Sequence, residues 1–151
     1  MRNFLLAVAR LAVSVHAAEP SLAPNAPKDK PVRGEVSKMD RAIAPFVEQA
    51  RKSWPGAKKR FLAGLPKGEI FYVTLQLHEG EQMEQCFLRV KKIDAGRISG
   101  TIENEITRLK KVHNGDPASV AEAEIVDWLI AKPDGSEEGN VVGKFLDTYQ
   151  P

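Results

Sequence analysis

The stretch "EIVDWLI", residues 124–130, decides the fold of the last third of the chain, because its surroundings carry signals for both a helix and a strand. Asp116 is placed as an N-cap and Pro117 as the first helical residue, which favours a helix over residues 118–131. The turn signal Asp134-Gly135, followed by the apolar residues 141–146, favours a hairpin instead. Taken alone, these residues leave both structures open.

Upstream of this stretch, a period of two predicts three antiparallel strands joined as a meander. In residues 69–80 apolar side chains alternate with others, and Gly80 marks a turn. Residues 82–93 return, and Gly96 turns the chain into a third strand over residues 98–104. Each connection is short enough for a hairpin.

An amphipathic helix is expected before the strands. Ser37 and Asp40 resemble a capping box. One apolar stripe follows at helical spacing, formed by Met39, Ala42, Ile43, Phe46, Val47 and Ala50. Because a proline inside a helix removes a hydrogen bond, Pro45 predicts a kink or a restart of the helix. Residues 57–62 are expected to form a separate short helical piece that Gly64 closes.

Residues 1–17 have the pattern of a signal peptide, with Arg2 before an apolar stretch and small residues before a cut after Ala17. A short amphipathic helix is the alternative. Cleavage would remove Arg2 and Arg10 and leave 20 basic residues against 20 acidic ones. The expected mature protein is therefore periplasmic or secreted and close to neutral, with no field that would attract nucleic acid and no stable membrane insertion.

Residues 18–36 are rich in proline and poor in apolar residues, which predicts a disordered tether. The single domain is then expected over residues 37–151. Its length is sufficient for one hydrophobic core.

Patterns typical of catalytic or metal sites are missing from the sequence. Cys86 is the only cysteine and is expected to pack as a small apolar residue. His78 and His113 lack the spacing of metal ligands, and there is neither a nucleophile elbow nor a glycine loop for phosphate. We therefore expect no catalytic, cofactor-binding or metal-binding residues and no cofactor.

From about residue 39 to residue 146 the chain resembles the YegJ-like bacterial domain of unknown function. The similarity rests on the first helix, "IFYVTLQL" at residues 70–77, "GRISGTIENE" at 96–105, Gly115-Asp116 and "IVDWLI" at 125–130. The resemblance implies an α+β fold with a curved antiparallel sheet, and it implies no established activity.

This resemblance favours the hairpin over the helix for residues 118–131. Residues 121–125 are then a short helical turn at most, and residues 126–131 form a strand that pairs with residues 141–146. On such a strand Trp128 and Asp127 point to opposite faces. We expect Trp128 in the core and Asp127 hydrogen-bonded to a turn. The predicted fold is α+β, with the N-terminal helix, kinked near Pro45, packed on a curved and mostly antiparallel sheet of about five strands.

The favoured function is an exported, non-catalytic binding or inhibitor-type module, whose partner is another envelope protein or peptide. A candidate surface for that partner consists of Asp127, Trp128, Glu103, Asn104 and Glu105. The alternative is an envelope hydrolase that uses Asp127 with Glu103 or Glu105.

Overall fold

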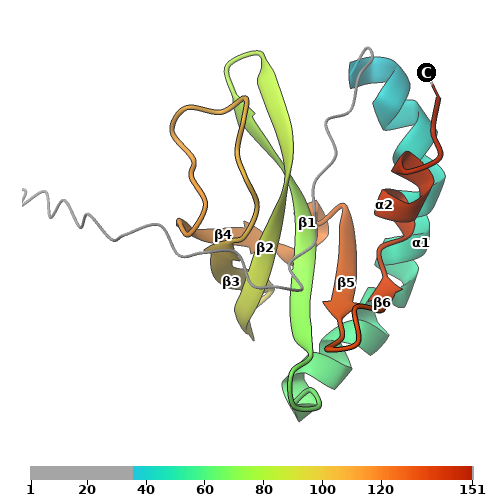
Figure 1. Ribbon diagram of the computed structural model, residues 1–151, viewed down its shortest axis with the longest axis vertical. Helices are drawn as coiled ribbons and strands as arrows, with labels where there is room; N and C mark the ends of the chain where they lie inside the picture. Colours follow the sequence, from blue (N-terminus) through green and yellow to red (C-terminus); the bar gives the residue numbers. More distant parts are fainter. Residues whose placement is uncertain (1–35, 151) are drawn as a thin grey trace, which may run out of the picture.

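The computed structural model describes residues 36–150, so the expected signal peptide and nearly all of the expected tether lie outside the described residues. The described part is an α+β fold with a long helix, an open six-stranded sheet and a short C-terminal helix (Figure 1). The elements are α1 (Val36–Ala63), β1 (Ile70–Glu79), β2 (Gln82–Asp94), β3 (Arg97–Ile102), β4 (Pro117–Ala121), the 3₁₀ turn η1 (Glu122–Glu124), β5 (Asp127–Ala131), β6 (Glu137–Gly139) and α2 (Val141–Leu146).

All neighbouring strands are antiparallel, and their order across the sheet is β4-β3-β2-β1-β5-β6. The expected meander of β1, β2 and β3 is confirmed. The chain then crosses to the other edge, where β5 pairs with β1. In this register Trp128 lies opposite Val73, and Asp127 lies opposite Thr74.

Helix α1 is one continuous helix that contains both Pro45 and Pro55. The expected restart at Pro45 and the separate helical piece at residues 57–62 are therefore wrong. Both prolines lie on the exposed side, where water can satisfy the carbonyl groups that lose their helical partner. The apolar stripe explains the continuity, because Ala50, Trp54 and Ala57 are all buried against the same face of the sheet.

Residues 121–131 follow the expected order of a short helical turn and a strand, whereas residues 141–146 form α2 instead of the expected strand. The strand that pairs with β5 at this edge is β6. Asn140 adopts a left-handed backbone with φ of 55°, which ends β6 and starts the helix. Helical spacing then brings Val142, Phe145 and Leu146 into one cluster with Met39 of α1, and the rings of Phe46 and Phe145 stack 4.3 Å apart.

Candidate functional site

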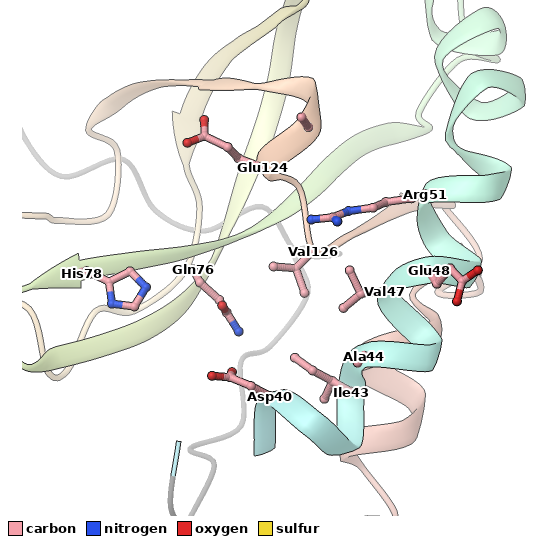
Figure 2. A pocket seen from close by; sticks show the side chains of 11 residues that line it. Asp40, Ile43, Ala44, Val47, Glu48, Arg51, Gln76, His78, Glu124 and Val126 are labelled. Atoms are coloured by element: carbon pink, nitrogen blue, oxygen red, sulfur yellow. The ribbon is translucent and has the colours of Figure 1, made fainter. Parts of the chain in front are cut away.

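A groove opens between the first half of α1, the C-terminal end of β1 and the segment from η1 to Val126 (Figure 2). It has a volume of about 660 Å³. Its floor is aliphatic and is made by Ile43 and Val47 from α1 and by Val126, which directly precedes β5. The complete lining is Asp40, Ile43, Ala44, Val47, Glu48, Arg51, Gln76, His78, Ala123, Glu124 and Val126.

The wall of the groove at η1 is fixed to α1 by side-chain hydrogen bonds. The indole nitrogen of Trp54 donates to one carboxylate oxygen of Glu122 at 2.9 Å, and the ammonium of Lys58 donates to the other at 2.6 Å. Arg51 adds a hydrogen bond from its Nε to the carbonyl oxygen of Ile125 at 3.3 Å. These contacts connect the segment from η1 to β5 with α1, so side chains of α1 position this wall of the groove.

Polar side chains surround the aliphatic floor. Within residues 36–150 the structure shows no hydrogen bond or ion pair for the side chains of Asp40, Gln76 or His78. Glu124 accepts a hydrogen bond from the backbone nitrogen of Ala121 at 2.9 Å. The rim of the groove therefore carries polar groups that the described fold does not use, next to an apolar surface.

Trp128 is 7% exposed and lies in the core beneath α1, as expected. Its indole nitrogen donates to the carbonyl oxygen of Ala50 at 3.2 Å and to the hydroxyl of Ser53 at 3.0 Å. These bonds satisfy the one polar atom of the side chain and fasten β5 to α1.

Asp127 is 1% exposed and lies on the opposite face of β5 from Trp128. One carboxylate oxygen accepts a hydrogen bond from its neighbour's backbone nitrogen, and the other accepts from the backbone nitrogen of Val142 at 2.6 Å. Asn140, the residue before α2, makes no side-chain cap. Asp127 therefore accepts from an amide at the start of α2, 15 residues later in the chain, which has no helical partner. The expected structural hydrogen bond to the backbone is present, but its donor belongs to a helix and not to a turn.

The titration of Asp127 should make the stability depend on pH. Burial raises the pKa of Asp127 to about 6, although the backbone amides of Val142, Trp128 and Gly143 act to lower it. Folding therefore favours the protonated form, so this contribution to stability is complete below about pH 4 and is lost as the pH rises through about 6. Relative to Asp127→Asn, we expect the wild type to lose up to about 3 kcal/mol of unfolding free energy between pH 4 and pH 7.

Urea unfolding of both proteins at several pH values measures this difference. Comparing the two removes the effect of all other carboxyl groups. A difference that stays constant over that range would show that Asp127 does not titrate there.

Glu103 lies directly after β3 and joins a polar cluster on the sheet. Its carboxylate accepts from the hydroxyl of Tyr72 at 2.8 Å and pairs with Arg89 at 3.1 Å. Burial, followed by the hydrogen bond to Glu103, raises the pKa of Tyr72.

Asn104 is buried, with its side-chain oxygen bonded to the backbone nitrogen of Phe87 at 2.7 Å and its amide nitrogen to the carbonyl of Glu105. The Glu105 side chain is exposed.

The structure does not bring Asp127 together with Glu103. Asp127 pairs with Thr74 on β1, Thr74 pairs with Phe87 on β2, and Phe87 accepts a hydrogen bond from the backbone of Glu103. Three strand spacings, about 14 Å, therefore separate the two residues. None of the five residues of the predicted surface lines the groove.

Glu84 is a structural residue that was not predicted from the sequence. It is 7% exposed, and its carboxylate accepts from the backbone nitrogens of Thr107, Arg108 and Leu109 and from the Thr107 hydroxyl. Burial works to raise the pKa of Glu84, but these hydrogen bonds outweigh it and hold the pKa below its usual value. The sequence does carry one indication of this role: Glu84 lies on the same face of its strand as Cys86 and Leu88, which are buried.

Within residues 36–150, no three His, Cys, Asp or Glu side chains are grouped to hold a metal ion. No helix of that part of the chain has the length and apolar character needed to cross a membrane.

Comparison with known proteins identifies one family. A family model described as "Uncharacterized protein conserved in bacteria (DUF2314)" matches residues 37–147, which include every described strand and both helices from residue 37 onward. No curated protein and no solved structure matches the chain. The chain therefore belongs to the uncharacterised bacterial DUF2314 family.

Proposed function

We propose that the protein is an exported, non-catalytic binding module that holds a segment of another envelope protein or a peptide in the groove beside α1. The observation that supports this most is the groove itself, in which an aliphatic floor is bordered by polar side chains. Three of these, Asp40, Gln76 and His78, have no hydrogen bond or ion pair within residues 36–150. Apolar surface next to a few oriented polar groups is the usual composition of a binding site.

The position of the carboxylates favours binding over hydrolysis. A pair of catalytic acids must reach the same substrate atoms. Asp127 is instead buried and accepts hydrogen bonds from two backbone amides, and Glu103 is hydrogen-bonded to Tyr72 and Arg89. The polar groups available to a ligand are those of the groove rim. We also keep the narrower YegJ-like assignment within the family as a proposal, which rests on the quoted motifs.

The proposal of export rests on the composition of residues 1–17. If a signal peptidase cuts after Ala17, the protein recovered from the periplasm or the medium of a bacterial host should begin at Ala18. Intact-mass measurement of that protein tests this directly. Recovery from the cytoplasm with residues 1–17 still attached would contradict export.

A bulky residue in the groove should weaken binding without harming the fold. Ala44 lines the groove and is exposed, and Ala63 is exposed on the same helix but lies outside the groove. Peptides selected from a random phage-displayed library on the wild-type protein should bind Ala44→Arg about tenfold or more weakly, because the new side chain fills the site. Ala63→Arg should bind them with unchanged affinity.

Calorimetric titration of both variants measures this. Failure to enrich any peptide, or equal binding by the two variants, would contradict the proposal.

A further inference from the structure

Charged side chains stand at the two ends of the stripe of α1 that lines the groove. Asp40, Ala44, Val47 and Arg51 follow one another at helical spacing, so they lie on one face of α1. Figure 2 shows Asp40 and Arg51 at opposite ends, with Val47 between them and Ile43 beside Asp40. The two charged positions are eleven residues apart along the helix, a rise of about 16 Å, which is the length of about five extended residues.

Neither end charge is neutralised within residues 36–150. Asp40 is exposed and has no ion pair there. Arg51 uses its Nε for the carbonyl of Ile125, which leaves the N–H groups of its two terminal nitrogens for a ligand.

The neighbouring acids leave Arg51 unpaired as well. Glu48 pairs with Lys52 at 2.8 Å and points away from the groove in Figure 2. Glu124 makes its hydrogen bond to the backbone of Ala121. The groove thus presents a negative end, an aliphatic middle and a positive end with a fork suited to a carboxylate.

We propose that the occupant is an extended peptide segment of about five residues, with a Lys or Arg at Asp40, an aliphatic side chain over Ile43 and Val47, and an Asp or Glu at Arg51. This inference rests on the proposed function and adds the chemistry of the ligand. Complementary charges at the two ends fix the register in which the segment lies.

Charge exchange tests the inference on the full chain. Peptides selected on the wild-type protein should carry an aliphatic residue between a basic and an acidic one, with the basic residue toward either end of the peptide. Asp40→Lys should weaken their binding about five- to tenfold, because an attraction becomes a repulsion, and a peptide whose basic residue is changed to Glu should recover the loss. Arg51→Glu should act in the same way at the other end. Glu81→Lys and Lys67→Glu make the same charge changes on exposed residues outside the groove and should leave affinity unchanged.

Thermal midpoints verify that each variant folds. If Arg51→Glu is unstable, the Asp40→Lys measurement is sufficient by itself, because Asp40 has no hydrogen bond or ion pair to lose within residues 36–150. The inference would be overturned if the selected peptides bound Asp40→Lys as tightly as the wild type, or if the control variants weakened binding equally. Either result would leave the groove as a binding site. If no peptide is enriched, the proposed function fails and this inference fails with it.

Discussion

Replacing Trp128 with alanine is expected to lower the free energy of unfolding by about 3–5 kcal/mol, because a buried aromatic side chain leaves a cavity in the core. Trp128 lies between β5 and α1, packs at a tilt against Phe71 and donates to Ala50 and Ser53. For a domain of this size the loss corresponds to a decrease of about 10 °C or more in the melting temperature.

Thermal unfolding followed by circular dichroism measures this change. Trp128→Phe keeps part of the volume but loses the indole hydrogen bonds, so its effect should be intermediate. Leu62→Ala is the control, because Leu62 is 58% exposed and its truncation should change stability little. An unchanged melting temperature for Trp128→Ala would contradict the placement of this side chain in the core.

The second large effect is expected from Gly100→Ala in β3. A Cβ atom at position 100 would lie 1.9 Å from the carbonyl oxygen of Arg89 on β2, beside the irregularity between Val90 and Lys92. Because that oxygen belongs to the backbone of a central strand, the two strands would have to separate. We expect a loss of several kcal/mol or failure to fold.

Gly56→Ala is the matched control and should change stability in the opposite direction. Gly56 lies inside α1, and an added Cβ there would meet no atom within 4 Å. Replacing a helical glycine with alanine commonly stabilises by about 0.5–1 kcal/mol. Urea unfolding of both variants tests the pair, and equal effects would contradict the close approach of β2 and β3 at Gly100.

The first three strands could be predicted from the sequence because their signals are local. Alternating apolar residues and the glycines at the two turns determine each hairpin within about ten residues. The separation of Asp127 and Trp128 onto opposite faces follows equally from the two-residue period of a strand.

Helix α2 could not be predicted in this way, because its support comes from distant parts of the chain. Its start depends on the left-handed backbone of Asn140 and on the carboxylate of Asp127, and its apolar side chains pack on α1. The apolar residues among 141–146 fit a strand as well as a helix, so contacts with distant parts of the chain decide their structure.

The groove was equally hidden in the sequence. Ile43 and Val47 belong to the expected apolar stripe, but the pattern does not say that the stripe borders an opening shared with β1 and Val126. The surface predicted from motifs instead contains residues that stabilise the fold. Asp127 caps α2, Trp128 fastens β5 to α1, and Asn104 satisfies the backbone of β2.

We propose the groove beside α1 as the site at which this protein binds its partner. Titrating a selected peptide into isotope-labelled full-length protein, and following backbone amide signals by NMR, tests it most directly. We predict that the shifted signals cluster at Ile43, Val47, Gln76 and Val126, while those of β3 and β4 remain in place. Shifts confined to the β3–β4 edge or to the β5–β6 hairpin, with none at α1, would contradict the claim.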